Sequence, residues 1–151
     1  MTGEKVVAFC DRYGNILAPF LTAAGNRNES PLFPEAFSGL KEMALKAGFS
    51  LSGSIMSLDG VYDSKANRKK IFNHNMTPNI PENKRNRKRT KRGRKRKFDK
   101  GTFRKRFETI ERCFAWEDKF KRLLVRFERI SGLHLSLKLI AFTMINLRRH
   151  I

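Results

Sequence analysis

The chain lacks the cysteines and histidines that a disulfide framework or a zinc site requires. Its two cysteines among 151 residues, Cys10 and Cys113, have no second cysteine or histidine at metal-ligand spacing. His74, His134 and His150 likewise have no partner at the spacing of a nucleophile or a metal site. We therefore expect two buried thiols in a reducing compartment and assign no chemistry to the histidines.

Long apolar runs are also lacking. Val6 to Cys10 is too short for the core of a signal peptide. The longer run, residues 133–147, is interrupted by polar residues and is shorter than the roughly 20 residues that cross a bilayer. We expect a soluble, cytoplasmic protein with no membrane partner.

Acidic residues are scarce, with 14 Asp and Glu against 33 Lys and Arg and a net charge of +19. Charge of this size repels itself unless a polyanion neutralises it. Between Lys84 and Lys97, eleven of fourteen residues are basic and none is apolar. This composition excludes the buried face of an interfacial helix and predicts a basic disordered insertion. It favours binding to nucleic acid over a merely solvated or nuclear-localisation-like charge run.

The N-terminal part predicts a hairpin followed by a helix. Two β-prone runs, residues 6–10 and 16–21, flank a loop whose Gly and Asn tolerate a positive φ. Ser30 before Pro31 then predicts the N-cap and first turn of an amphipathic helix that ends near Lys46.

The middle of the chain predicts a strand, a helix and another short strand. The apolar run 51–58 predicts a strand that presents a carboxylate at its end. Asp63 or Ser64 can cap the following helix, which continues to Phe72, and a short extended piece is expected around Ile80.

The C-terminal part predicts two long helices. The first begins at Thr102 and ends or kinks at Ser131, and the second spans about 133–147 and is expected to be largely buried. Apolar residues spaced for one face of the first helix are Phe103, Phe107, Ile110, Phe114, Leu124 and Phe127. Trp116 and the phenylalanines are expected in the core, not as base-stacking platforms.

Three short segments carry a specific resemblance. SLDGVYDS (residues 57–64) places an acidic residue at a strand end shortly before a helix start, and RFETIERCFAW (106–116) precedes FKRLLVRFE (120–128). The first resembles the region of the second aspartate in DDE transposases of bacterial insertion sequences. The others resemble the region of the glutamate in the same family. Asp59 and Glu111 are the matching positions.

This resemblance implies an α/β, RNase H-like mixed sheet with helices that ends in two long helices. It also implies DNA cleavage and strand transfer, in which three carboxylates hold two divalent cations, expected to be Mg²⁺. Asp59 and Glu111 would be catalytic residues and metal ligands. The alternatives are an ordinary Asp-Gly turn for Asp59, a surface charge on an amphipathic helix for Glu111, and a helix cap for Asp63.

The first aspartate of the family has no counterpart here. It would lie on a strand before Thr2, and Asp11 is no substitute, since it ends a strand that runs antiparallel to the absent one. We therefore expect residues 1–151 to form a partial RNase H-like domain with two unpaired sheet edges. Such a fragment would bind DNA and be unable to cut it alone.

The expected DNA contacts are basic residues of the insertion and of the first long helix. They neutralise phosphates without reading sequence. These residues are Lys84, Arg85, Arg87, Lys88, Arg89, Lys91, Arg92, Arg94, Lys95, Arg96, Lys97, Arg112, Lys119, Arg122 and Arg126.

Two rival hypotheses remain open. The chain could be a non-catalytic basic protein that binds RNA or DNA, in which case neither carboxylate binds a divalent metal. Alternatively, the product of an upstream reading frame could supply the absent strand and aspartate. The expected partners are the DNA ends and target of the insertion sequence, with a homodimer or an upstream transposase fragment as possible protein partners.

Overall fold

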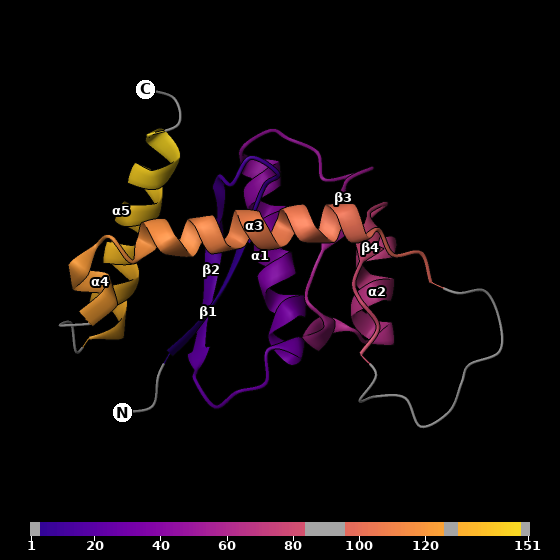
Figure 1. Cartoon of the computed structure of the whole chain (residues 1–151), viewed down its shortest axis with the longest axis horizontal. Coiled ribbons are helices and arrows are strands. Elements are labelled where there is room, and N and C mark those ends of the chain that lie inside the picture. Colours follow the sequence, from indigo (N-terminus) through magenta and orange to yellow (C-terminus); the bar gives the residue numbers. More distant parts are fainter. Residues whose placement is uncertain (1–3, 84–95, 126–129, 149–151) are drawn as a thin grey trace. The chain divides into compact units, whose positions relative to one another are not determined.

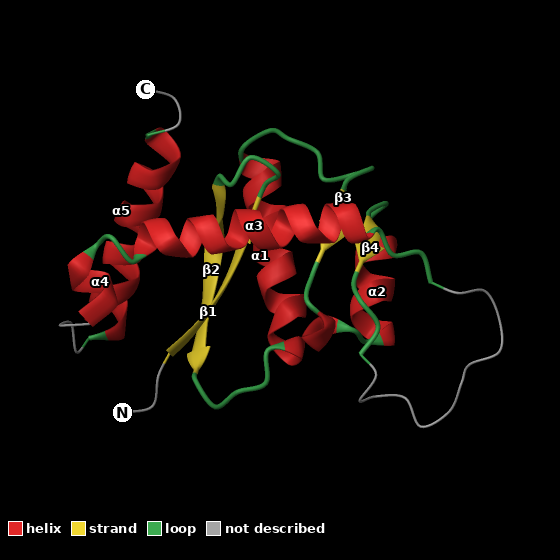
Figure 2. Cartoon of the chain, in the orientation of Figure 1, coloured by secondary structure: helices red, strands yellow, loops and turns green. Residues whose placement is uncertain are grey.

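A computed structural model describes residues 4–83, 96–125 and 130–148 (Figure 1). The chain divides into two compact units, each described by itself. Unit 1 consists of Met1–Ala8 and Ala18–Arg104, and unit 2 of Phe9–Leu17 and Lys105–Ile151. Helices and strands both occur, so the fold is mixed α/β as expected (Figure 2).

The chain begins with a hairpin of β1 (Glu4–Cys10) and β2 (Ile16–Ala24). Five residues join the two paired strands, which is too short for a parallel crossover, so the pair is antiparallel as predicted. In the loop, Asp11 accepts hydrogen bonds from the backbone N–H groups of Tyr13 and Asn15, at 2.8 and 2.9 Å. Asp11 is therefore a turn-forming residue.

The first long helix of unit 1 is α1 (Phe33–Lys46), preceded by the 3-10 turn η1 (Ser30–Leu32). The prediction that Ser30 caps it directly is wrong, because the 3-10 turn intervenes and no side chain caps either element. The apolar face is as predicted, with Phe33, Phe37 and Leu40 at most 2% exposed. This face forms the largest part of the core of unit 1.

Two short strands, β3 (Ile55–Ser57) and β4 (Thr77–Asn79), form a parallel pair with Met56 opposite Pro78. The helix α2 (Lys65–Phe72) connects them. β3 is shorter than predicted because the chain turns before it, with Gly53 at a φ of +78°. β4 precedes the predicted position around Ile80. The described strands thus form two separate two-stranded sheets.

The remaining helices are α3 (Lys100–Glu117), α4 (Lys121–Val125) and α5 (Ser131–Leu147). The prediction of one helix from Thr102 to Ser131 is wrong. After α3 the backbone tightens, with the Phe120 N–H donating to the Glu117 carbonyl three residues earlier. None of the described helices combines the length and apolar character that crossing a bilayer requires.

The prediction that α5 is largely buried is wrong. Its buried residues form one stripe of His134, Ala141, Phe142 and Ile145, while Ile140 and other apolar residues of the helix are more than half exposed. Inside unit 2, the side chain of Asn146 binds α5 to the hairpin. It donates to the Ile16 carbonyl at 2.9 Å and accepts from the Ile16 N–H at 2.8 Å.

Candidate functional site

Asp59 lies two residues beyond the carboxyl end of β3. It precedes the 3-10 turn η2 (Gly60–Tyr62), and its carboxylate accepts a hydrogen bond from the Gly60 N–H. The residue is exposed, and among the described residues none forms an ion pair with it. Since β3 and β4 run parallel, Asp59 lies at the same edge of this sheet as the chain leaving β4. Carboxyl edges of parallel strands are where α/β proteins place functional groups.

Asp63 is a more densely bonded carboxylate than the sequence suggests. Its Oδ1 accepts from Arg68 Nε and from Arg96 Nη1, both at 2.8 Å, and its Oδ2 accepts from the Asn83 N–H at 3.0 Å. Its side chain is only 9% exposed. Of the two predicted caps of α2, Ser64 is the one that the structure confirms, since its hydroxyl accepts from the Asn67 N–H, and Asp63 does not cap the helix.

Burial by itself would raise the pKa of Asp63. The Asn83 N–H and the guanidinium groups of Arg68 and Arg96 outweigh burial and hold this pKa below its ordinary value. Asp63 is therefore ionised at neutral pH. The sequence contained a signal for the pair of Asp63 and Arg68, an acid and a base five residues apart. It contained no local signal for the second partner of Asp63, because Arg96 lies 33 residues away.

The same edge of the parallel pair also fixes the start of α3. The buried Asn79 donates from Nδ2 to the Asp99 carbonyl at 3.0 Å, and its Oδ1 accepts from the Asp99 N–H at 2.9 Å. Asp99 in turn caps α3, since its carboxylate accepts from the Gly101 and Thr102 N–H groups. The helix thus begins two residues before the predicted Thr102.

Glu111 lies on α3 in unit 2, whereas Asp59 belongs to unit 1. It is exposed, and its helical neighbours Phe107 and Phe114 are 55% and 49% exposed. The expectation that Phe107 and Phe114 lie in the core is therefore wrong. The residues of α3 that are buried are Cys113 and Glu117.

Glu117 forms an ion pair with Lys138 of α5 within unit 2. The Nζ of Lys138 lies 2.5 Å from Glu117 Oε1, and both side chains are at most 15% exposed.

Cys10 and Cys113, remote in sequence, also meet in this unit. Their hydrogen bond, followed by burial, raises the pKa of the Cys10 thiol, so it stays protonated and unreactive at neutral pH.

The basic residues expected to bind DNA are distributed over both units. Arg96 and Lys97 lie just before α3, and Arg112 and Lys119 lie in α3 and directly after it. All four are exposed. The remaining expected contacts lie outside the described residues, including the side chain of Arg122. They are Lys84, Arg85, Arg87, Lys88, Arg89, Lys91, Arg92, Arg94, Lys95 and Arg126.

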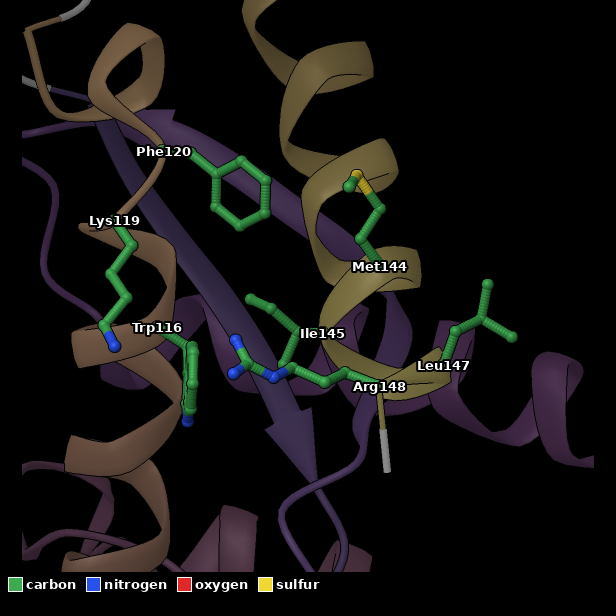
Figure 3. A pocket seen from close by; sticks show the side chains of 7 residues that line it. All are labelled: Trp116, Lys119, Phe120, Met144, Ile145, Leu147 and Arg148. Carbon is green, nitrogen blue, oxygen red and sulfur yellow. The ribbon is translucent and has the colours of Figure 1, made fainter. Parts of the chain in front are cut away.

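Unit 2 contains a hollow of about 620 Å³ with Trp116 on one wall (Figure 3). Lys119 Nζ lies 3.9 Å and Arg148 Cζ 4.1 Å from the centre of the Trp116 ring. Figure 3 shows the two cations on either side of the ring. Trp116 is half-buried here, not a core residue as predicted. Arg148 was not expected at this site, although it is a basic residue at the end of α5.

Asp59 and Glu111 offer oxygen donors of the kind that Mg²⁺ prefers. Among the described residues, however, no group of three or more Asp, Glu, His and Cys side chains could hold a metal ion. The carboxylates that are tightly paired, Asp63 and Glu117, are engaged by arginine and lysine. The described residues thus include exposed carboxylates of suitable chemistry, but they do not form an assembled metal centre.

Comparison with known proteins adds one match. A family model described as "Transposase DDE domain" matches residues 56–148, which include Asp59, Asp63 and Glu111. No curated protein and no solved structure matches the chain. The matched span covers more than half of the chain, and the family acts on DNA with divalent metal. The chain therefore belongs to the DDE transposase domain family.

Proposed function

We propose that this chain binds DNA in the transposition of an insertion sequence and that Asp59 and Glu111 are two metal-binding carboxylates of its catalytic site. The position of Asp59 carries the proposal. It is an exposed carboxylate at the carboxyl edge of a parallel strand pair, inside the span that matches the family. This is where a fixed ligand for a phosphate-bound cation is useful.

An RNase H-like architecture is part of this proposal. The element order of strand, strand, helix, strand, helix, strand and helices supports it, as does the parallel pairing of β3 with β4. The β1–β2 and β3–β4 pairs are separate sheets among the described strands. A further strand pairing with both would join them into one mixed sheet.

The proposal assigns two of the three carboxylates of the family's site to this chain. Asp59 and Glu111 would each supply oxygen ligands to Mg²⁺, and the bound metal would supply the activation of the attacking oxygen and stabilise the leaving oxygen. Among the described residues, no three Asp, Glu, His or Cys side chains form a group that could hold a metal ion. We therefore assign no cleavage step to this chain alone, and its partner would be a second copy or an upstream transposase fragment.

Binding to DNA would rest mainly on the segment from Lys84 to Lys97. Its eleven Lys and Arg would neutralise several phosphates and release their counterions. If six of them engage, the slope of log affinity against log salt is about −5. Weak sequence preference is expected, because phosphate contacts position the protein without reading bases.

The test combines cleavage, metal binding and DNA binding by the purified chain, with Asp59→Ala beside the matched exposed control Asp118→Ala. We expect DNA binding and no cleavage in Mg²⁺ or Mn²⁺. Asp59→Ala lowers Mn²⁺ affinity by more than about tenfold, since even groups that support metal ligands contribute about 10- to 100-fold. Cleavage by the wild-type chain alone that Asp59→Ala abolishes would refute the incomplete site.

A second candidate function is non-catalytic binding of DNA or RNA. The observation in its favour is that the Asp59 carboxylate already has a structural task, since it accepts from Gly60 at the start of η2. Metal binding separates the two functions. Equal Mn²⁺ affinity of the Asp59→Ala and Asp118→Ala variants would favour the non-catalytic function.

A further inference from the structure

The side chain of Asp63 contacts Asn83, directly before the basic segment Lys84–Lys97, and Arg96, near the end of that segment. The Asn83 N–H, directly before residue 84, donates to Oδ2 at 3.0 Å, and Arg96, directly after residue 95, donates to Oδ1 at 2.8 Å. The residues 20 and 33 positions away in sequence thus meet at one carboxylate. That carboxylate is four residues from Asp59 and belongs to the same unit.

We propose that Asp63 is a positioning residue that holds Asn83 and Arg96, the described residues on either side of positions 84–95, at the edge where Asp59 lies. This inference rests on the proposed function, in which the segment binds DNA. Asp63 itself touches neither metal nor DNA in the proposal. It acts through the two residues that it holds.

Further contacts fix Asp63 to the rest of unit 1. Arg68 of α2 donates to Asp63 through Nε, and its Nη2 donates to the Ile80 carbonyl at 2.6 Å. Pro81 packs close to the Asp59-Gly60 turn, because a Cβ on Gly60 would lie 3.6 Å from Pro81 Cγ. The turn that carries Asp59 and the chain that leaves β4 therefore pack side by side at this edge.

Charge alone and positioning predict opposite changes in DNA affinity when Asp63 is replaced. An acidic group beside a segment that binds a polyanion repels the ligand, so its neutralisation should strengthen binding. If Asp63 instead positions the segment, its loss frees Asn83 and Arg96, and binding must then order these two residues again at a cost in conformational entropy. The sign of the change in affinity separates the two effects.

The experiment compares Asp63→Asn with Asp118→Asn, which removes the same charge from an exposed residue, on a fluorescent DNA duplex. Dissociation constants are calculated for the active fraction of each preparation. We expect Asp118→Asn to bind equally or slightly more tightly and Asp63→Asn to bind about three- to tenfold more weakly. Binding by Asp63→Asn as tight as by Asp118→Asn overturns the proposal.

A double-mutant cycle with Arg96→Gln distinguishes positioning from general destabilisation. Arg96→Gln should weaken binding more than Lys97→Gln, which removes the neighbouring exposed cation. In the presence of Arg96→Gln, Asp63→Asn should have a much smaller additional effect. Fully additive losses would mean that Asp63 acts through stability of the fold, and the proposal fails.

Hydrogen exchange of the Asn83 amide tests the clamp without DNA. The amide should be protected in the wild-type chain and exchange faster in Asp63→Asn, whereas Asp118→Asn leaves it unchanged. If the wild-type chain binds no DNA but shows this protection, the proposed function fails while the clamp stands. An unprotected Asn83 amide in the wild-type chain refutes the clamp itself.

Discussion

Asn79 joins the parallel strand pair to the start of α3, and its replacement tests how strongly this edge is held. The residue is 3% exposed. Its side chain exchanges two hydrogen bonds with the backbone of Asp99, at 2.9 and 3.0 Å, and donates a longer one to Ser57 Oγ at 3.3 Å. Asn79→Leu keeps a similar volume and removes all three.

The expected loss of unfolding free energy is about 1.5–3 kcal/mol. Three neutral hydrogen bonds at about 0.5–1.5 kcal/mol each set the range. We expect a loss in the lower part of that range because Asp99 is exposed, so water can replace some of the hydrogen bonds that its backbone loses. The N-terminus of α3 should also loosen, which would appear as faster exchange of the Asp99 amide.

The assay is urea unfolding followed by circular dichroism, with amide exchange at Asp99 as the local measurement. Asn26→Leu serves as the control, since Asn26 is exposed and undergoes the same chemical change. If Asn79→Leu destabilises the chain by no more than about 0.5 kcal/mol beyond this control, the pairing of Asn79 with Asp99 contributes no net stability.

Three further outcomes follow from buried groups. Phe37→Ala should cost about 3–5 kcal/mol in urea unfolding, since Phe37 is fully buried, whereas Leu45→Ala, at an 82% exposed position, should change stability by less than about 0.5 kcal/mol. Lys138→Met should cost about 1–3 kcal/mol because it leaves Glu117 unpaired at 11% exposure, and adding Glu117→Gln should recover part of this; no recovery would contradict an electrostatic cause. The pKa of Asp63 is lower in the folded chain than its ordinary value of 3.8, so ionised Asp63 stabilises the fold above pH 3.8. This stabilisation is lost as the pH falls through the folded pKa. The Tm of Asp63→Asn should therefore decline less steeply in acid than that of the wild-type chain.

Local signals in the sequence predicted most elements of unit 1. The hairpin around Asp11, the apolar face of α1 and a strand ending shortly before Asp59 all depend on residues within a few positions of one another. Propensity, turn chemistry and periodicity act over that range. The family resemblance at residues 57–64 and 106–128, which the comparison confirms, is also a property of short segments.

The burial of helices could not be predicted in the same way. Periodicity shows which residues share a face, but not whether another element covers that face. Phe107 and Phe114 of α3 have the spacing of a core stripe and are half exposed, while Cys113 and Glu117 are buried. Exposed apolar residues of α5, such as Ile140, depart from prediction for the same reason.

The sequence by itself determined the family, the basic character, the order of elements and the candidate carboxylates Asp59 and Glu111. Only the tertiary structure revealed that Asp63 binds both Asn83 and Arg96 and that Asn79 holds the start of α3. The physical reason is distance along the chain. Hydrogen bonds between residues 20 or more positions apart form only when strand pairing and helix packing bring them together, and no local pattern encodes that meeting.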